Sequence, residues 1–281
     1  MRIITRDRTL NFDDKVHVMG IVNITPDSFS DGGRISDAST LLELVDHMVD
    51  SGADIIDIGG ESTRPFAPPV SLREELDRVI PAIDAIRNRH RIPISIDTTK
   101  AEVAGRAIAA GADIINDISG LRHDPAMVCV AAEQQVPVII MHMQGTPRDM
   151  QVNPTYHDVI AEIRDDLAER ILWAENHGVS RDKIIIDPGI GFGKTASHNL
   201  TILRELRQFT SLGCPVLIGH SRKSFIGTIL AVDDPRRRDE ATAIISALCA
   251  WNGASIIRVH DVAKTVQAVK MARAISQGST K

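Results

Sequence analysis

The sequence predicts an α/β fold of one domain, a (β/α)8 (TIM) barrel in which eight parallel strands are surrounded by helices. Three observations carry this prediction. The chain has 281 residues, a length that such barrels commonly reach without splitting. Eight short runs rich in Ile and Val show little internal alternation, which is typical of strands buried on both faces. Helix-like segments separate the runs, and strands that alternate with helices indicate a parallel sheet.

The predicted strands follow one another between residues 17 and 261. They are HVMGIVNIT (17–25), DIIDIGG (54–60), PISIDT (93–98), DIINDIS (113–119), PVIIMHM (137–143), KIIIDPG (183–189), PVLIGHS (215–221) and SIIRVHD (255–261). Residues 1–281 are assigned to one domain, with a short N-terminal extension before these core strands and a helix after them.

Helices are expected in the gaps between strands. Ser71 and Glu74 form a capping box at the start of one of them. Gly52, Gly111 and Gly253 each follow an apolar-periodic segment and are typical of helix C-caps that lead into a strand. The predicted helices span roughly 36–51, 71–90, 100–110, 124–134, 155–177, 198–208, 236–252 and 261–276.

A short internal echo follows these glycines. The heptapeptides GADIIDI, GADIIND and GASIIRV place Asp57, Asn116 and Arg258 at one offset from the glycine. Repetition of a strand–helix unit explains the echo without any function.

Composition limits the classes of function. An apolar fraction of 43% is ample for a core, and only 3% aromatic residues predict an aliphatic interior. A net charge of −5 with mixed signs argues against a nucleic-acid surface. Cys129, Cys214 and Cys249 lack CxxC spacing and indicate a reducing compartment. The first residues contain no apolar signal region and no run reaches membrane-span length, so a cytoplasmic protein is expected.

Polar residues stand at or just beyond the end of each predicted strand. In a (β/α)8 barrel, catalytic groups lie at this C-terminal face. Alternate side chains of a strand share a face, so Ser95 and Asp97 point the same way, as do Arg258 and His260. Buried charges need partners or a ligand, and a structural network among them is the alternative to a binding site. The strand-end residues are Asn23, Asp57, Asp97, Asn116, His142, Asp187, Ser221, Arg258 and His260.

The segment DPGIGFGKT (187–195) contains glycines but fits neither common nucleotide motif. Pro188 stands where a P-loop needs Gly, and Lys194 stands where the dinucleotide fingerprint needs its third Gly. A glycine-rich turn that brings its backbone and Phe192 close to a ligand, with Asp187 directed into the pocket, fits the segment better.

Two neighbouring segments predict an anion-binding corner. SRKS (221–224) starts a helix, where backbone N–H groups together with Arg222 and Lys223 favour an anion. RVHD (258–261) adds a cation and a hydrogen-bond donor on the next strand. The loops after the last two strands of a barrel commonly form a phosphate site.

Acids and an amide are expected across from this corner. Asp97, Asn116 and Asp187 supply acceptors and donors for a flat, nitrogen-rich ring, and a carboxylate stabilises positive charge developing on it. Tight metal-ligand spacing such as HExxH is not found in the sequence, and His142 and His220 are expected to serve packing or supporting roles. The long loops at 25–36 and 61–71 are candidate lids over the site.

Eight segments together resemble the dihydropteroate synthase family, which acts in folate biosynthesis. They are NITPDSFSDGG (23–33), DIGGESTRP (57–65), ISIDT (94–98), IINDISG (114–120), MHMQGTP (141–147), DPGIGFGK (187–194), GHSRKSFIG (219–227) and RVHD (258–261). The match follows the order of nearly the whole chain. Phe66, where the family usually has Gly, and His220 depart from its pattern, and Phe66 bears on the fit of 4-aminobenzoate and sulfonamides.

The resemblance implies that 4-aminobenzoate attacks the methylene of dihydropterin diphosphate. It assigns the pterin to Thr63, Asp97, Asn116, Asp187 and Lys223, and the diphosphate to Asn23, Arg258 and His260, with Asn23 near Mg²⁺. It assigns 4-aminobenzoate to Phe29, Arg64, Pro65, Phe192 and Ser221. Asp97, Lys223, Arg258 and His260 are the expected catalytic residues. The resemblance also suggests a homodimer, formed through helices near the end of the barrel.

Two other functions remain open at this point. A pterin-binding methyltransferase on a similar barrel would also use acids and Asn for the ring, but it should not need both the SRK and the RVH segments. A non-catalytic pterin-binding paralogue would be expected to have lost one of the catalytic residues, and Asp97, Lys223, Arg258 and His260 are all present.

Overall fold

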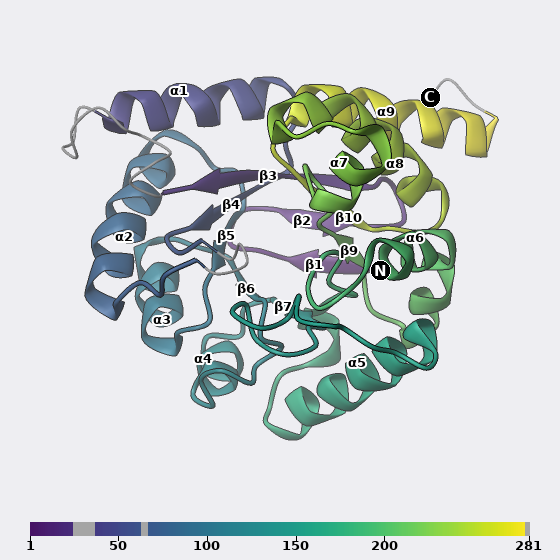
Figure 1. Cartoon of the computed structure of the whole chain (residues 1–281). Coiled ribbons are helices and arrows are strands. Elements are labelled where there is room, and N and C mark those ends of the chain that lie inside the picture. Colours follow the sequence, from purple (N-terminus) through teal and green to yellow (C-terminus); the bar gives the residue numbers. More distant parts are fainter. Residues whose placement is uncertain (25–36, 63–66, 279–281) are drawn as a thin grey trace.

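The computed structural model describes residues 1–24, 37–62 and 67–278. Strands and helices alternate along them (Figure 1). The strands are β1 (Arg2–Ile4), β2 (Thr9–Asn11), β3 (His17–Asn23), β4 (Ile55–Gly59), β5 (Ile94–Asp97), β6 (Ile114–Asp117), β7 (Val138–Met141), β8 (Ile184–Asp187), β9 (Leu217–Ile218) and β10 (Ile256–Val259). The α-helices are α1 (Asp37–Asp50), α2 (Leu72–Arg89), α3 (Ala101–Ala110), α4 (Met127–Gln134), α5 (Val159–Asn176), α6 (Ala196–Arg204), α7 (Ser224–Leu230), α8 (Asp239–Trp251) and α9 (Val262–Gln277).

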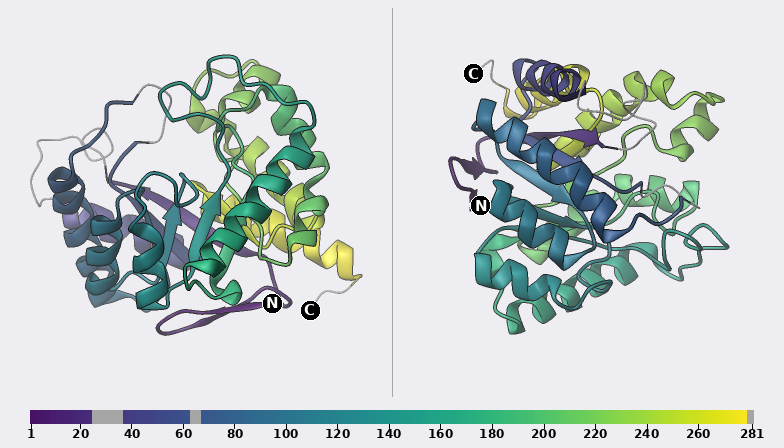
Figure 2. Two further views of the ribbon diagram at one scale, coloured as in Figure 1. Left: turned by 90° about the horizontal axis from the view of Figure 1, so that it is seen from below. Right: turned by 90° about the vertical axis from the view of Figure 1, so that its left-hand side faces the viewer.

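Strands β3 to β10 form one parallel sheet that closes on itself. Their order is β8-β7-β6-β5-β4-β3-β10-β9. A parallel bridge between Ile186 and Val216 joins the two outer strands of this order, and the amide of Ile186 donates to the carbonyl of Pro215 over 2.9 Å. The helices surround the sheet on the outside (Figures 1 and 2). The predicted (β/α)8 barrel is therefore confirmed.

Alternation along each strand separates two apolar layers. Ile56 and Ile58 pack outward in the cluster formed with the helices. Ile55, Ile114 and Ile256 belong to a separate cluster inside the barrel. Because side chains two residues apart share a face, Asp57, Asn116 and Arg258 point into the barrel one layer nearer its C-terminal end. The apolar side chains of the interior cluster lie below these polar residues and close the bottom of the C-terminal opening of the barrel, called the mouth from here on.

The N-terminal extension is a structural element that the sequence reading left undefined. β1 and β2 pair as an antiparallel hairpin, and Figure 2 shows it lying across one end of the barrel. Ile3 and Leu10 of the hairpin join the interior cluster of Met19, Ile55 and Ile114. The hairpin thus covers the apolar residues at the N-terminal end of the barrel, which would otherwise face water.

Replacing Ile3 with Ala is expected to lower the free energy of unfolding by about 3 kcal/mol, the cost typical of truncating a buried Ile. Ile3 is 1% exposed, whereas its neighbour Ile4 is 60% exposed, so Ile4→Ala is the matched control and should change stability little. Denaturant titration measures both, and kcat should stay unchanged in both because the hairpin lies at the end opposite the strand-end polar residues. Equal losses of stability in the two variants would contradict the role of the hairpin in covering the N-terminal end of the barrel.

The helix boundaries differ from the predicted ones in several places. The helix expected from 155 starts at Val159, where the side chain of Asp158 caps two amides, and the one expected from 124 starts at Met127. The predicted 198–208 helix is α6 followed by a 3-10 turn at Leu206–Leu212, and α8 starts at Asp239, after a 3-10 turn at Pro235–Arg238. Side-chain caps mark the starts of α5 and α6, whereas α4 and α8 begin without one. The capping box of Ser71 and Glu74 is present as predicted.

Within the described residues, none of the helices combines the length and apolar character that crossing a membrane requires.

Candidate active site

One row of neighbouring residues crosses the C-terminal ends of four strands. The register pairs Asn23 with Gly59, Gly59 with Asp97, and Asp97 with Asn116. A Cβ at Gly59 would lie 3.6 Å from Oδ1 of Asn23 and 3.8 Å from Oδ2 of Asp97. The missing side chain at Gly59 therefore leaves one space that both polar groups border.

Arg258 is the centre of a buried charge network. Its guanidinium lies 2.6 Å from a carboxylate oxygen of Asp57 and 2.6 Å from one of Asp97. The amide nitrogen of Asn116 donates to both oxygens of Asp57 over 3.3 Å. Arg258 was expected to face Asp97, Asn116 and Asp187 across the mouth, and instead it contacts Asp97 directly, together with Asp57. Each buried charge thereby has a partner, as its burial requires.

Asp57 was named among the strand-end residues, but no role was assigned to it. The internal echo was the signal that would have found it. Asp57, Asn116 and Arg258 stand at one offset from the glycines of the three heptapeptides, and in the barrel these three residues form one hydrogen-bonded group. Equal offsets place side chains in the same layer of a barrel, so the echo could have served to predict this contact, although no such prediction was made from it.

Burial and neighbouring charges together set the pKa values of Asp97 and Arg258. Burial raises the pKa of Asp97 to about 7, because desolvation disfavours the carboxylate more than Arg258 favours it. Burial alone would lower the pKa of Arg258, but the carboxylates of Asp57 and Asp97 raise it above its ordinary value. Arg258 therefore stays charged, and Asp97 is the member of the group that can take up a proton near neutral pH.

The glycine-rich turn after β8 brings Asp187 and Lys223 to the same mouth. Burial raises the pKa of Asp187 to about 6, although the amide of Gly189, which donates to its carboxylate over 2.7 Å, favours the charged form. The ammonium of Lys223 lies 4.0 Å from the centre of the Phe192 ring, a cation–π contact. Burial, followed by the charge of Arg258, lowers the pKa of Lys223 to about 8.

Asp187 and Arg258 border the same space. A Cβ at Gly219 would lie 3.8 Å from Oδ2 of Asp187 and 3.9 Å from Cδ of Arg258. Asp187 therefore approaches the Arg258 network across a glycine, as Asn23 and Asp97 do across Gly59. Acids and cations occupy one mouth of the barrel.

Ser221 and His260 lie together at the ends of the last two strands. The hydroxyl of Ser221 is 2.9 Å from Nδ1 of His260, and the backbone amide of His260 donates to the same hydroxyl over 3.2 Å. The predicted neighbourhood of the SRKS and RVHD segments is therefore present in the structure.

The expectation that Arg222 helps to bind an anion was wrong. Its guanidinium forms two hydrogen bonds with the carboxylate of Asp239, at 2.6 and 2.7 Å. Arg222 has a φ of 58°, and this left-handed conformation lets consecutive side chains leave the turn in different directions. Arg222 fastens the turn to α8, and Lys223 is the cation that faces the mouth.

His142 and His220 are buried and bonded within the protein. The ammonium of Lys194 lies 3.0 Å from Nδ1 of His142, and Nε2 of His220 lies 2.9 Å from the carbonyl of Thr242. Burial lowers the pKa of His142 to about 2 and that of His220 to about 4, with nearby lysines adding to both shifts. Both imidazoles are neutral at physiological pH.

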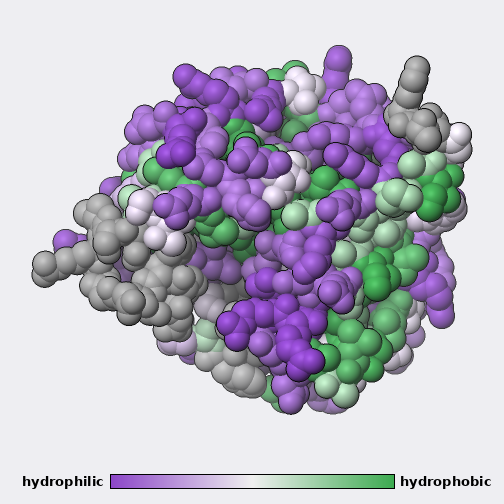
Figure 3. All heavy atoms as spheres, turned by 90° about the horizontal axis from the view of Figure 1, so that it is seen from above, coloured by the Kyte–Doolittle hydropathy of each residue, from purple (hydrophilic) through white to green (hydrophobic). Residues whose placement is uncertain are grey.

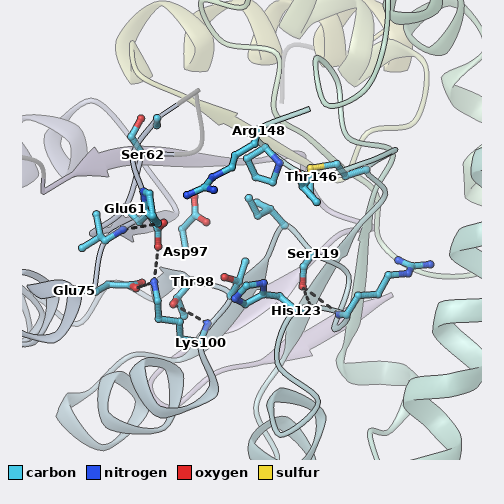
Figure 4. A pocket seen from close by; sticks show the side chains of 18 of the residues that line it. Glu61, Ser62, Glu75, Asp97, Thr98, Lys100, Ser119, His123, Thr146 and Arg148 are labelled. Carbon is cyan, nitrogen blue, oxygen red and sulfur yellow. Dashed lines mark hydrogen bonds and ion pairs between the residues drawn. The ribbon is translucent and has the colours of Figure 1, made fainter. Parts of the chain in front are cut away.

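A cavity of about 620 Å³ opens beside Asp97 (Figure 4). It lies among the loops that follow β4, β5, β6 and β7, and Thr98, Ser119 and Arg148 are among its lining residues. Lys100 joins the carboxylates of Glu61 and Glu75 at its edge. This volume is in the range of small-molecule sites, and it continues the mouth that Asp97 borders.

Several predicted site residues lie outside the described part of the chain. They are Phe29, Thr63, Arg64, Pro65 and the unusual Phe66. The described residues 61, 62 and 67–70 bracket the second loop, and the amide of Val70 donates to the carboxylate of Glu61 over 3.2 Å.

A barrel whose mouth joins buried acids, cations and a cavity is the architecture of a small-molecule enzyme. Known proteins specify which one. The family described as "Pterin binding enzyme" matches residues 19–260. The dihydropteroate synthase of Synechocystis is 50% identical over 261 residues, which cover 93% of this chain and 90% of the relative.

Solved structures agree with the sequence comparison. A Yersinia pestis dihydropteroate synthase with a sulfonamide drug complex has a TM-score of 0.93 at 41% identity and covers 99% of this chain and 100% of its own. The Xanthomonas albilineans enzyme with 7,8-dihydropteroate has a TM-score of 0.89 at 40% identity, covering 98% of this chain and 99% of its own. The same enzyme was solved with 4-aminobenzoic acid, with a TM-score of 0.92 at 43% identity, covering 98% of each chain.

The chain belongs to the pterin-binding enzyme family, among its dihydropteroate synthases. Its activity is that of an alkyl transferase of folate biosynthesis.

Proposed function

We propose that the barrel mouth joins 4-aminobenzoate to the methylene carbon of dihydropterin diphosphate, giving dihydropteroate and diphosphate. The observation that carries this proposal is that acids and cations meet at the barrel mouth, where Arg258 contacts Asp97 over 2.6 Å and Asp187 approaches Arg258 across Gly219. The substrate has a polar ring at one end and a diphosphate at the other. A mouth that combines buried acids with cations can hold both ends at once.

The pterin ring is assigned to Asp97, Asn116, Asp187 and Lys223, with Thr63 beyond the described residues. A pterin carries N–H donors and ring nitrogen and oxygen acceptors. Buried carboxylates gain most from donors of this kind, because they have lost their water. Asp97 and Asp187, both with raised pKa values, would regain hydrogen bonds and their ordinary charge when the ring binds.

The diphosphate is assigned to Asn23, Arg258 and His260. Mg²⁺ commonly binds through one or two protein oxygens together with substrate phosphates. Oδ1 of Asn23 borders the open space over Gly59 beside Asp97, which fits an ion that arrives with the diphosphate. Grouped His, Cys, Asp or Glu side chains able to hold a metal without substrate do not occur in the described residues. When bound there, Mg²⁺ would neutralise charge on the leaving diphosphate.

The 4-aminobenzoate is assigned to Phe192 and Ser221, together with Phe29, Arg64 and Pro65, which are not among the described residues. Phe192 offers an aromatic face, and Lys223 lies against it. The hydroxyl of Ser221 accepts from the backbone amide of His260, and it can donate its proton to a carboxylate when Nδ1 of His260 carries a proton of its own.

The chemistry favours a dissociative path. The aniline nitrogen is a weak nucleophile, so the reaction depends on departure of the diphosphate. Breaking the carbon–oxygen bond leaves a methylene cation that the pterin ring delocalises, and the carboxylate of Asp97 offsets its positive charge. The aniline nitrogen then forms the new bond and loses its proton. If diphosphate never leaves unless 4-aminobenzoate is bound, this path loses its support.

The direct test mixes purified protein, Mg²⁺, dihydropterin diphosphate and 4-aminobenzoate. Equimolar diphosphate and dihydropteroate are expected. A pterin-binding methyltransferase would release neither, and a non-catalytic paralogue would bind the pterin without turnover. Absence of product from folded, pterin-binding protein would contradict the proposal.

The activity should have a bell-shaped pH dependence. Burial raises the pKa of Asp97 to about 7 and lowers that of Lys223 to about 8. Below pH 7 Asp97 takes up a proton and loses its negative charge, and above pH 8 Lys223 loses its positive charge. Because both charges take part, kcat/KM should be maximal between these values. The alkaline limb should vanish in a Lys223→Met variant that keeps residual activity. If the fall in kcat/KM above pH 8 persists in Lys223→Met, it reports the titration of a residue other than Lys223.

We also propose that the chain forms a homodimer through α8 and α9. Large apolar side chains are exposed on these helices, and Figure 3 shows hydrophobic surface gathered on the right of the face it views. Ile244, Leu248, Met271 and Ile275 are 59–65% exposed, and clustered exposed apolar residues mark association surfaces. Leu248→Glu should shift a sedimenting dimer to monomer, while Leu172→Glu, an equally exposed change on α5, should not. A wild-type monomer at micromolar concentration would contradict the proposal.

A further inference from the structure

The glycine-rich turn after β8 packs against the segment after β7 at backbone distance. A Cβ at Gly189 would lie 1.9 Å from the carbonyl oxygen of His142, and one at Gly193 would lie 2.4 Å from that of Gln144. Both glycines have a positive φ, 71° and 63°. The two backbones therefore pack directly against each other, with no room for side chains between them. Hydrogen bonds between the two segments set the distance between their backbones.

Lys194 is the side chain buried in this junction. It is only 2% exposed. Its ammonium donates to Nδ1 of His142 over 3.0 Å, to the carbonyl of Phe192 over 2.9 Å and to the carbonyl of His142 over 3.4 Å. One ammonium thus bonds both segments. A buried lysine is rare unless its charge is matched. Burial lowers the pKa of Lys194 to about 7, although the carboxylates of Asp187 and Asp166 favour its charged form.

The turn that Lys194 holds carries a substrate-facing group. Phe192 is buried beside Ile118, Met141 and Met150, and its ring lies under the ammonium of Lys223. The carbonyl that Lys194 binds belongs to the same residue, Phe192. A shift of this backbone therefore moves the Phe192 ring and changes the cation–π contact that positions the Lys223 ammonium.

Other bonds hold the outer side of the turn. The hydroxyl of Tyr156 donates to the carbonyl of Gly193 over 2.9 Å, and the amide of Gly191 donates to Oδ1 of Asn199 over 2.8 Å. These anchors come from α6 and from the chain before α5. On the β7-facing side, the side-chain amide of Gln151 donates to the carbonyl of Gly191 over 2.6 Å, and the amide of His142 donates to the carbonyl of Asp187 over 2.9 Å. Among the bonds of this side, those of Lys194 are the ones made by a buried charged side chain.

We propose that Lys194 is a positioning residue for the reaction. It fastens the glycine-rich turn to the end of β7 through His142 and thereby sets the Phe192 ring and the Lys223 ammonium at the mouth. This role rests on the proposed function, because the contact of Lys223 with substrate belongs to that proposal. Lys194 itself touches no reacting atom.

The test begins with Lys194→Met, which keeps an unbranched side chain only one atom shorter and removes its donors. We expect faster amide hydrogen exchange at residues 189–193 and a fall of about 10- to 100-fold in kcat/KM, the scale that a misplaced catalytic constellation typically costs. Lys270→Met, an exposed change on α9, is the control and should match wild type in both measurements. Unchanged exchange in the turn, or faster exchange with wild-type kinetics, would overturn the proposal.

A pair of variants at His142 makes the test independent of whether Lys194→Met folds. His142→Asn keeps an acceptor for the ammonium, whereas His142→Leu removes it. We expect the Asn variant to stay near wild type in turn exchange and in kcat/KM, and the Leu variant to resemble Lys194→Met. Equal behaviour of the two would show that the acceptor is irrelevant and would overturn the proposal.

A double-mutant cycle separates positioning from a purely structural role. If Lys194 acts through Phe192, the effects of Lys194→Met and Phe192→Leu on kcat/KM will be strongly non-additive, and additive effects would refute the link. Lys223→Met is measured alongside. Wild-type turnover in that variant would remove Lys223 from the proposed function, while the exchange data would still judge the fastening of the turn by Lys194.

Discussion

Asp97→Asn should lower kcat by about 100- to 1000-fold, the loss typical of removing a group that stabilises charge in a transition state. Asp97 has the same shape as Asn, so the substitution removes its charge while leaving its volume. The carboxylate lies 2.6 Å from Arg258 and borders the space over Gly59. In the proposed reaction it offsets the positive charge of the pterin methylene cation. Steady-state release of diphosphate measures the effect.

Asp113→Asn is the matched control for Asp97→Asn. Asp113 is also a buried carboxylate bonded to an arginine, with 2.5 Å to Arg87, but it precedes β6 and therefore lies at the opposite end of the barrel. We expect it to lose about 3 kcal/mol of unfolding free energy, the scale for breaking a buried ion pair, and to retain its kcat. A wild-type kcat in Asp97→Asn would contradict the charge-stabilising role of Asp97.

Lys223→Ala should lower kcat/KM by about 100-fold, as loss of a charged hydrogen-bond donor at a reacting site commonly does. Its fold should survive, because the ammonium rests on the Phe192 ring and burial opposes its charge. Removing Lys223 therefore relieves a desolvation cost while it removes a contact. Kinetics with both substrates and a thermal melt measure the two effects.

Lys264→Ala controls for the loss of a lysine near the same face. Lys264 pairs with Asp261 over 3.1 Å at the start of α9 and is about half exposed. An exposed pair of this kind contributes little to stability, and kcat/KM should stay at the wild-type value. If Lys223→Ala turned over like Lys264→Ala, Lys223 would not belong to the site.

Predicting the site from sequence worked where strand periodicity was sufficient. Parity placed Asp97 and Arg258 on inward faces, and the ends of parallel strands always meet at one edge of a barrel. The direct bond between Asp97 and Arg258 was not predictable from parity, because it depends on how far adjacent strands are displaced along each other. The strand register gives this displacement. Asp97 lies opposite Asn116 on the neighbouring strand, whereas Arg258 lies opposite Met19, four positions before the strand-end residue Asn23.

Side chains in turns were harder to place than those in strands. Arg222 and Lys223 are adjacent in sequence, and both were expected to face an anion. The positive φ of Arg222 sends its guanidinium to Asp239 and leaves Lys223 at the mouth. Sequence patterns carry period 2 along a strand, but no period predicts the direction of a side chain in a turn.

Lys194 illustrates a second limit. In the sequence it served only to exclude a nucleotide motif. Its partners are carbonyl groups and a neutral imidazole, and backbone acceptors leave no compositional trace. Its burial between two segments could be seen only once β7 and β8 were side by side.

The amino-acid sequence by itself determined the barrel, the family and the set of polar residues at the strand ends, because apolar runs, glycine caps and long motifs are local properties of a chain. The tertiary structure alone decided which of those charges touch, that a hairpin covers the floor of the barrel, and that Lys194 bonds two turns. The physical reason is that ion pairing and burial depend on distances between segments far apart in sequence, which strand displacement and backbone conformation set.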